Sequence, residues 1–309
     1  MPVRAILAWL LVAPCAAWAV VRLGGLERGY PLVQIVAYTP LAAVGAILVV
    51  LVATALRQRL AALSAAVIAL SLAVVVAPRA LGGSSEVAGQ PLRVLSANLH
   101  HRPEAAPGLV ALVRRTRPDV LSVQEATPEV VRALDVAGLP RLLPQRVVAA
   151  STGRPANALY ASTRLRPIAN TPPQTSPLAA ARLGRRQVEI YAVHPRAPVL
   201  SGSTAAWLDD LRALPAATPG GPIRILAGDF NATLDHAELR RLLDTGYEDA
   251  ADAVGAGLRA TWPQGRRFPP PVTIDHVLAD ERCGFRAVSV HSLPRSDHRA
   301  VLAEIVLPR

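Results

Sequence analysis

The sequence predicts an α/β protein in two parts, with three transmembrane helices ahead of a domain in which helices cover the sheets. Three observations lead to this fold class. The first 79 residues contain three long uncharged runs. From residue 91 onward, short strand-like segments mix with helical ones without strict alternation. Several late strand-like segments follow one another directly, which favours sheets with antiparallel pairs over a doubly wound parallel sheet.

The uncharged runs have 17, 28 and 19 residues and are Ala5–Val21, Gly29–Leu56 and Leu60–Pro78. A spanning helix needs about 20 mostly apolar residues, so residues 1–79 are predicted to form a membrane region. A cleaved signal peptide is the alternative for the first run, because Arg4 precedes it and Ala17 and Ala19 resemble a cleavage site. Two further spans would still hold the protein in the membrane.

Arginines near the ends of these runs predict the orientation. Arg4, Arg57 and Arg59 fall on one side of the membrane, and the other side receives Arg22, Arg28 and Arg79. The tight loop with Arg57 and Arg59 favours a cytoplasmic N-terminus. We therefore expect a multi-pass protein of the cytoplasmic membrane with its C-terminal domain outside. Residues 80–90, rich in Gly and Ser, are predicted to be a linker, and residues 91–309 the domain.

Apolar patterning predicts the elements of this domain. The expected strands are Leu92–Ala97, Asp119–Gln124, Arg146–Ala150, Ala156–Ala161, Gln187–Val193, Ile223–Ala227, Val272–Leu278, Phe285–His291 and Ala300–Val306. The expected helices are Ala106–Arg117, Pro128–Leu134, Thr204–Leu214 and His236–Leu243. A Pro-rich loop is expected after Ala161, through Pro177. Thr127 is expected to cap the helix that begins at Pro128.

Charge and cysteine content bound the function. All 33 basic residues are arginine, and the net charge of +11 divides into +5 for residues 1–85 and +6 for the rest. This suits an anionic substrate but is too mild to indicate nucleic-acid binding. Cys15 and Cys283 lie in regions of different character, so no disulfide is expected, and neither has a partner at metal-ligand spacing.

Polar side chains stand at the ends of many of the predicted strands. They are Asn98, Glu125, His194, Asp229, Asn231, Asp275, Asp297 and His298. Mg²⁺ takes oxygen ligands and is usually held by one or two carboxylates, a role that suits Glu125. A carboxylate beside a histidine fixes its tautomer and stabilises its protonated form, as Asp275 could do for His298. Metal, histidine and amide donors together can stabilise a phosphate ester under attack.

The motifs around these residues resemble those of the endonuclease/exonuclease/phosphatase superfamily, which has the DNase I-like fold. In order they are LRVLSANLH, RPDVLSVQEA, YAVHP, LAGDFNAT, TIDHVLA and SDHRAV. The resemblance extends from about Pro91 to the C-terminus. It implies a four-layer α/β sandwich and a phosphoric ester hydrolase that uses Mg²⁺, with Mn²⁺ as an alternative.

The resemblance also implies roles for single residues. Glu125 would be the principal metal ligand, with Asn98 beside it, and Asp297 would assist the metal or the leaving group. Asp229 would orient or deprotonate the attacking water. The remaining roles are a donor to the pentacovalent phosphate for Asn231, a phosphate contact for His194, and a catalytic histidine with its carboxylate partner for His298 and Asp275.

Other residues near these motifs have no such match. His100 and His101 have no assigned role, and packing or surface positions are expected for His236, His276 and His291. Trp262 is interpreted either as a substrate contact or as a loop-packing residue. The arginines at positions 182, 185 and 186 are expected in a solvated loop or against anionic lipid headgroups.

These inferences predict a membrane-anchored Mg²⁺-dependent phosphoesterase. It would hydrolyse a phosphodiester or a lipid-linked phosphate by metal-assisted attack of water. One alternative is an extracellular or membrane-bound DNA endonuclease or exonuclease, although long DNA-contacting insertions are not found between Ser151 and Pro177. The other is a non-catalytic membrane binding module. The substrate and the oligomeric state stay open.

Overall fold

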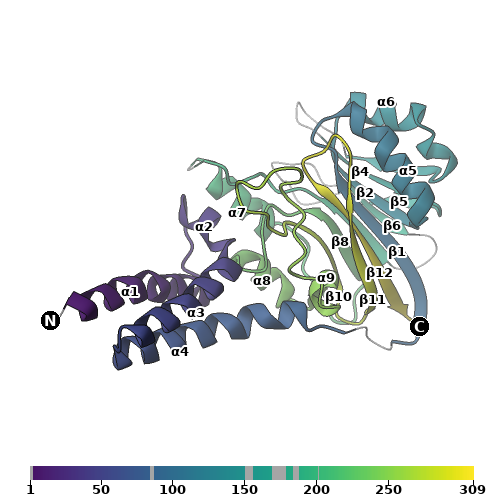
Figure 1. Ribbon diagram of the computed structural model, residues 1–309. Helices are drawn as coiled ribbons and strands as arrows, with labels where there is room; N and C mark the ends of the chain where they lie inside the picture. The colour runs from purple at the N-terminus through teal and green to yellow at the C-terminus, as the bar shows by residue number, and fades with distance from the viewer. Residues whose placement is uncertain (1–2, 84–86, 150–155, 169–178, 184–187, 201) are drawn as a thin grey trace.

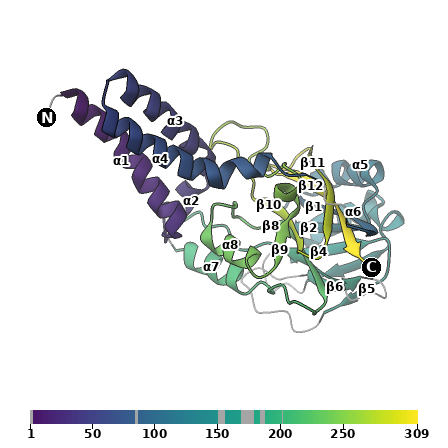
Figure 2. The same cartoon turned by 90° about the horizontal axis from the view of Figure 1, so that it is seen from below.

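The computed structural model describes residues 3–83, 87–149, 156–168, 179–183, 188–200 and 202–309. A bundle of apolar helices projects from one side of a larger α/β body (Figures 1 and 2). The bundle contains α1 (Val3–Gly24), α3 (Thr39–Ala55) and α4 (Arg59–Val76). A short helix, α2 (Leu32–Val36), lies between α1 and α3.

Two helical stretches, Val3–Gly24 and Arg59–Ala80, are long and apolar enough to cross a membrane. The prediction of three such helices is wrong for the second run, because Gly29–Leu56 is not one helix. Pro31 precedes α2 and Pro40 stands in the first turn of α3, so that α3 keeps only 17 residues. Inside a helix, a proline removes a backbone donor and clashes with the preceding turn, whereas in the first turn it is tolerated. The two prolines therefore divide the run into separate helices.

The α/β body contains two six-stranded sheets. The first has the order β11-β12-β1-β2-β4-β3 and the second has the order β5-β6-β7-β8-β10-β9. Strands of the first sheet are β1 (Gly89–Asn98), β2 (Val120–Ala126), β3 (Gln145–Val148), β4 (Ala156–Ala161), β11 (Gly284–Ser292) and β12 (Arg299–Pro308). Strands of the second are β5 (Leu165–Pro167), β6 (Ala179–Leu183), β7 (Val188–Val193), β8 (Ile223–Asp229), β9 (Tyr247–Asp249) and β10 (Asp275–Asp280).

Helices cover the outer faces of the sheets and complete four layers. The inner core between the sheets is built from Ala, Val, Ile and Leu, including Val94, Ile190 and Ile305. The helices α5 (Ala106–Thr116) and α6 (Pro128–Val136) bury a second core against the first sheet. The helices α7 (Thr204–Arg212) and α8 (Ala237–Leu243) do the same on the second sheet, around Trp207 and Phe230. The four-layer α/β sandwich is therefore confirmed.

Most predicted elements have a counterpart, with boundary shifts at their ends. The strand expected from Val272 begins only at Asp275, because Val272 forms an isolated bridge with Trp262. The strands β5, β6 and β9 and the one-turn helix α9 (Ala250–Ala253) were not predicted. The loop interpretation is wrong at Leu165–Pro167, while residues 169–178 lie outside the described part. Thr127 caps α6 as expected, by accepting from the Val130 backbone N–H at 3.2 Å.

The segment between the bundle and the sandwich is anchored at both described ends. The carbonyl of Arg79 accepts a hydrogen bond of 3.0 Å from the backbone N–H of Gly257. A Cβ at Gly82 would stand 2.3 Å from the Ala253 carbonyl oxygen, so only glycine fits this close approach. The strand β1 begins at Gly89, two positions before the domain start expected at residue 91, and pairs there with Pro308.

Candidate active site

The topology gathers the polar strand ends at one edge of the sandwich. The pairs β1–β2 and β7–β8 are parallel, so their carboxyl ends share an edge. The strands β12 and β10 run antiparallel to β1 and β8, which brings their amino ends to the same edge. In the second sheet Asp275 stands directly opposite Asp229. The side chain of Asn98 joins the two sheets by donating to Asp229 Oδ2 at 3.1 Å.

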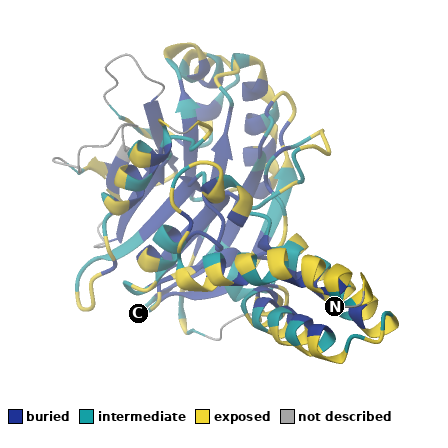
Figure 3. Ribbon diagram, turned by 90° about the vertical axis from the view of Figure 1, so that its left-hand side faces the viewer, coloured by how far each residue is buried: buried dark blue, intermediate teal, exposed yellow. Residues whose placement is uncertain are grey.

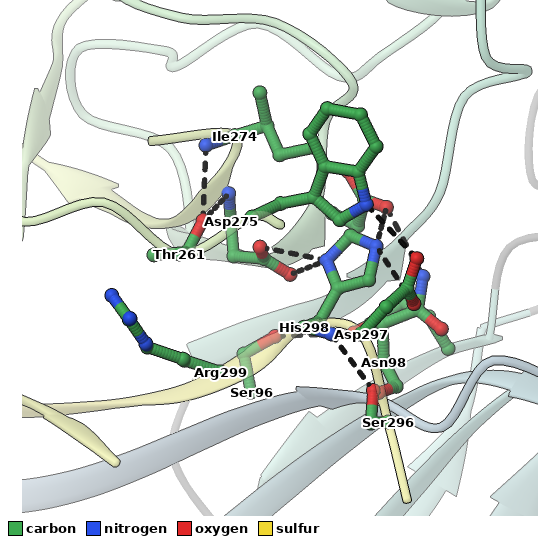
Figure 4. Close-up of polar contacts among 12 residues, drawn as sticks. Ser96, Asn98, Thr261, Ile274, Asp275, Ser296, Asp297, His298 and Arg299 are labelled. Carbon is green, nitrogen blue, oxygen red and sulfur yellow. Dashed lines mark hydrogen bonds and ion pairs between the residues drawn. The ribbon is translucent and has the colours of Figure 1, made fainter. Parts of the chain in front are cut away.

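All the site residues predicted from the sequence meet here. A cavity of about 440 Å³ is lined by Glu125, His194, Asp229, Asn231, Asp297 and His298. Asn98 and Asp275 lie behind this wall, with 0% and 2% of their surface exposed. The sequence-based grouping is thus reproduced in space, and Figure 4 shows the part around His298.

His298 stands between two carboxylates. Its Nδ1 is 2.9 Å from Asp275 Oδ2, and its Nε2 is 3.5 Å from Asp229 Oδ2. Burial lowers the pKa of His298, but the charges of Asp275 and Asp229 outweigh burial and raise that pKa to about 10. The imidazole is therefore a cation at neutral pH, held in one orientation by Asp275.

Asp229 is fully enclosed, and burial raises its pKa against the opposing charge of His298. Its Oδ1 accepts from the Asn231 backbone N–H at 2.8 Å. The preceding Gly228 is required by packing, since a Cβ there would stand 1.8 Å from the Val193 carbonyl oxygen of β7. A desolvated carboxylate facing a cavity is suited to accept a proton from water.

Glu125 lies where β2 departs from regular pairing with β4. Its Oε1 accepts from Asn98 Nδ2 at 3.3 Å, and its Oε2 accepts no hydrogen bond. Asp297 Oδ1 likewise accepts none, while its Oδ2 accepts from Trp262 Nε1 at 3.0 Å. Two buried carboxylate oxygens without donors form an oxygen-rich set that fits a hard divalent cation.

His194 and Asn231 complete the cavity wall. His194 Nε2 lies 3.7 Å from both Glu125 Oε1 and Asp229 Oδ2. Asn231 Nδ2 donates to the Pro195 carbonyl at 3.0 Å, which uses one of its two amide hydrogens. Both side chains can therefore present a donor to an anion in the cavity.

Backbone strain is concentrated at this edge. Among the non-glycine residues with positive φ are Glu125 (57°), Asn231 (49°), His100 (50°) and His101 (53°). Such conformations cost roughly 1–3 kcal/mol each and persist where the surroundings enforce them. Asn98 Oδ1 accepts from the His100 backbone N–H at 2.9 Å, and the Asp229 contact described above holds Asn231.

His100 and His101 belong to the site, although the sequence suggested no role for either. His100 Nδ1 is 3.0 Å from Asp297 Oδ1, and His101 Nε2 is 2.7 Å from Glu125 Oε2. Each ring nitrogen thus lies within ion-pair distance of a carboxylate oxygen, without the alignment of a regular hydrogen bond. Their position two and three residues after Asn98 was the available signal.

The other singled-out residues divide between structural and surface positions. His276 is a packing residue as expected, with Nδ1 2.7 Å from Asp249 Oδ2. His236 is buried but also lines the cavity, so packing is only part of its role. His291 is half-buried on β11, with its Nε2 2.9 Å from Ser289 Oγ. Trp262 both lines the cavity and holds Asp297.

The prediction that Arg182 lies in a loop is wrong, because Arg182 is part of β6. Its Nε pairs with Glu189 Oε1 at 3.5 Å. Residues 185 and 186 are outside the described part. Both cysteines are free, as predicted.

One further grouping is relevant to metal binding. Ligand atoms of Asp229, Asp275 and His298 lie within 4.8 Å of one another. Since His298 Nδ1 is engaged by Asp275, these residues are largely committed to each other. Glu125 Oε2 and Asp297 Oδ1 are better placed to receive a cation, because their histidine partners, His101 and His100, are exposed side chains.

Fold and site together define a phosphoric ester hydrolase of the DNase I-like type. The chain belongs to the Endonuclease/Exonuclease/phosphatase family, whose model matches residues 95–298. This match covers about two thirds of the sequence and extends from β1 to His298. No curated protein sequence matches the chain.

Solved structures share the fold. TDP2 of D. rerio complexed with single strand DNA product has 17% identity and a TM-score of 0.56, covering 71% of this chain and 100% of its own. An AP endonuclease from Archaeoglobus fulgidus has 15% identity and a TM-score of 0.54, covering 69% and 98%. A family protein from Beutenbergia cavernae has 16% identity and a TM-score of 0.53, covering 71% and 72%.

Proposed function

We propose that the protein is a membrane-anchored, Mg²⁺-dependent phosphoesterase that hydrolyses a phosphodiester or a lipid-linked phosphate. The observation that carries the proposal is the Asp275–His298–Asp229 chain, placed beside the carboxylates of Glu125 and Asp297 in one cavity. A general base, a cationic donor and a cation-binding set therefore face one cavity.

In this proposal Asp229 orients the attacking water and accepts its proton. Asn98 and the Asn231 backbone N–H hold the carboxylate in place. The oxygen of water attacks phosphorus, the bond to the leaving oxygen breaks, and negative charge grows on the phosphoryl oxygens. His298, His194 and Asn231 provide hydrogen-bond donors for that charge.

Glu125 would hold the metal, with Asp297 and Asn98 at its side. The donor set is oxygen-rich, which suits Mg²⁺ or Mn²⁺. When bound, the cation supplies neutralisation of phosphate charge. His100 and His101 would remain beside the two carboxylates and limit the space around the cation.

Membrane anchoring is supported by the surface of the bundle. Only 22% and 28% of the most apolar windows of the two long helices are buried, so most of this surface faces outward (Figure 3). A core helix of a soluble protein would be mostly covered. With 17 residues, α3 is at the lower limit for crossing a bilayer beside them.

An extracytoplasmic position of the domain is supported by the pairing and distribution of the arginines near the membrane region. Arg22 and Arg79, on the side of the sandwich, both pair with buried Asp235. Because both are paired, we do not count them among the charges that orient the protein in the membrane. Arg28 then remains on the side of the sandwich, and Arg4, Arg57 and Arg59 lie on the other side. An alkaline phosphatase fused after Arg309 should be active, and an inactive fusion with a protease-protected domain would reverse the orientation.

A DNA nuclease is the second candidate, favoured by the fold shared with TDP2 in complex with single strand DNA product. However, the described residues that line the cavity include no arginine. Nucleic-acid sites normally contact several phosphates with basic side chains. A non-catalytic binding module is disfavoured because the whole constellation of acid, base and donor residues is present.

A substrate panel tests the proposal. The full chain in detergent would be assayed on plasmid DNA, a phosphoinositide, sphingomyelin and a polyprenyl diphosphate, with Mg²⁺ or with chelator. Metal-dependent release from a lipid phosphate with little nicking of DNA is expected. Efficient DNA cleavage would instead support the nuclease, and no hydrolysis of any substrate would support the binding module.

A further inference from the structure

The membrane region supplies one wall of the active-site cavity. Val33, Gln34, Ala37 and Tyr38, from α2 and the residues after it, line the same cavity as Glu125, Asp229 and His298. These residues lie within a run that the sequence predicted to be buried in lipid. The site is thus formed by two regions of the chain that are far apart in the sequence.

Several contacts hold this wall against the sandwich. His236 Nε2 is 2.8 Å from the Val33 carbonyl, and Gln34 Nε2 donates to the Pro198 carbonyl. Beside them, Asp235 accepts from Arg22 Nε and Arg79 NH2 at 2.7 Å each, with 0% of its surface exposed. Hydrogen bonds to backbone carbonyls therefore hold the wall itself, and buried charge-assisted bonds hold the adjoining ends of the bundle helices.

The two sides of the cavity differ in chemistry. Carboxylates, histidines and Asn231 form the polar part of the lining, and the apolar part includes Val33 and Ala37 of the helical region together with Ala197, Pro198, Val272 and Ile274 of the α/β body. A small charged phosphate ester would use only the polar side. An apolar surface of this extent is typical of a pocket that also takes an apolar part of its ligand.

The lining continues toward the bundle and becomes mixed, since it includes the paired side chains of Arg79 and Asp235 beside apolar residues. A second cavity of about 130 Å³ shares Ala37, Tyr38 and Val272 with the first and reaches Pro40 and Leu41 on α3. Leu41 is 55% exposed on the outer surface of the bundle, where lipid would lie if the helices span a membrane. Residues 33–41 therefore connect the catalytic residues with the apolar exterior of the helices.

We propose that the substrate is an amphiphilic phosphate ester. Its phosphate would lie among Glu125, Asp229 and His298, and its hydrocarbon chain would follow residues 33–41 toward the bilayer. Val33, Ala37 and Tyr38 are then specificity-determining residues. This inference rests on the proposed phosphoesterase activity, and it selects a lipid phosphate over a nucleic acid because the described residues that line the first cavity include an apolar group and no arginine.

The test uses soluble and lipid-like forms of one ester. The full chain in detergent micelles would be assayed with methyl, octyl and hexadecyl para-nitrophenyl phosphate, by release of para-nitrophenolate. We expect kcat/KM to rise by at least about tenfold from the methyl to the octyl ester, since each buried methylene favours binding. Ala37→Trp should remove this preference, so that kcat/KM for the octyl ester falls to the value for the methyl ester measured with the same variant.

Two further variants separate the explanations. Leu48→Trp, on the exposed surface of α3 away from the cavity, should keep the preference, which controls for partition of the long esters into micelles. Ala37→Leu, a milder change, should reduce the preference in part. Equal kcat/KM for methyl and octyl esters in the wild type would overturn the inference, as would equal losses on both esters in both Ala37 variants. Failure to hydrolyse any ester would instead count against the phosphoesterase itself and remove the basis of the inference.

Discussion

Two buried aspartates six positions apart, Asp229 and Asp235, show how the same burial gives opposite electrostatic results. Burial raises the pKa of Asp229, whose charged neighbours are His298 and His194, which act to lower it, and Asp275, which raises it further. Burial also acts to raise the pKa of Asp235, but hydrogen bonds and charge from Arg79 and Arg22 lower it below its ordinary value. A histidine can exchange a proton with its partner, whereas an arginine keeps its charge at any relevant pH.

As a consequence, two aspartates on one short segment are suited to different roles. Asp229 is suited to accept a proton and faces the cavity, while Asp235 stays ionised and joins the bundle to the sandwich. The partner, rather than the depth of burial, decides whether a carboxylate serves chemistry or structure.

The largest expected effect is on stability, from Asp235→Asn. Removing this charge leaves Arg22 and Arg79 buried without a counter-ion, and breaking a buried ion pair from one side typically costs about 3–5 kcal/mol. Thermal unfolding of the full chain in detergent would measure it. The matched change Asp244→Asn, at an exposed aspartate that ends α8, should alter stability by no more than about 0.5 kcal/mol. We call the contacts of Asp235 with Arg22 and Arg79 the clamp. Equal stability of the two variants would show that the clamp contributes nothing to the free energy of unfolding.

The next effect is on turnover, from Asp229→Asn. Loss of the proton acceptor should lower kcat by roughly 10² or more, with KM little changed. Stability should be unchanged or higher, because a desolvated carboxylate is removed. Steady-state assays with bis(para-nitrophenyl) phosphate would separate kcat from KM. An increase in KM alone would mean that Asp229 binds the substrate instead of activating water.

Arg79→Lys should have a smaller effect. Arg79 contacts both oxygens of Asp235, through NH1 at 2.9 Å and NH2 at 2.7 Å. Lysine keeps the charge but cannot reproduce the planar two-bond contact, so we expect a loss of about 1–2 kcal/mol in unfolding free energy. Arg141→Lys on the exposed surface is the control. A loss as large as that of Asp235→Asn would show that geometry, not charge, dominates.

The pH dependence of stability gives the finest comparison. Because the pKa of Asp235 is lower in the folded state than its unfolded value of about 3.9, its contribution is fully present above that value. It is lost as pH falls through the folded pKa. The stability difference between wild type and Asp235→Asn should therefore be constant from pH 5 to 7 and shrink only below about pH 4. A difference that already shrinks near pH 6 would point to a histidine in the clamp.

The catalytic edge could be predicted because its residues interrupt apolar segments. Glu125 stands one residue before the end of β2 and Asp229 ends β8; each follows a run of buried residues, and the change from apolar to acidic is visible in the sequence. The strands β5 and β9 could not be predicted, since three residues are too few to show a period of two. Their pairing comes from the neighbouring strands of the second sheet.

The cavity wall and the clamp were beyond the reach of sequence patterns for another reason. Val33 and Tyr38 lie in an uncharged run that has the composition of a membrane helix. In the sequence, Arg22 and Arg79 lie at the ends of apolar runs, where arginines indicate membrane orientation. Asp235 lies in a polar segment that is typical of a surface turn. Only the fold shows that these three side chains meet, because their contacts join residues 156 or more positions apart.

The most direct test of the account is the Mg²⁺ dependence of bis(para-nitrophenyl) phosphate hydrolysis by the full chain, compared with Glu125→Gln. The account predicts that wild-type turnover rises to saturation with Mg²⁺ and disappears in excess chelator. Glu125→Gln should unfold at the wild-type temperature but show no saturable response to Mg²⁺. Undiminished hydrolysis in chelator, or the same Mg²⁺ response in the variant, would contradict metal-assisted hydrolysis at Glu125.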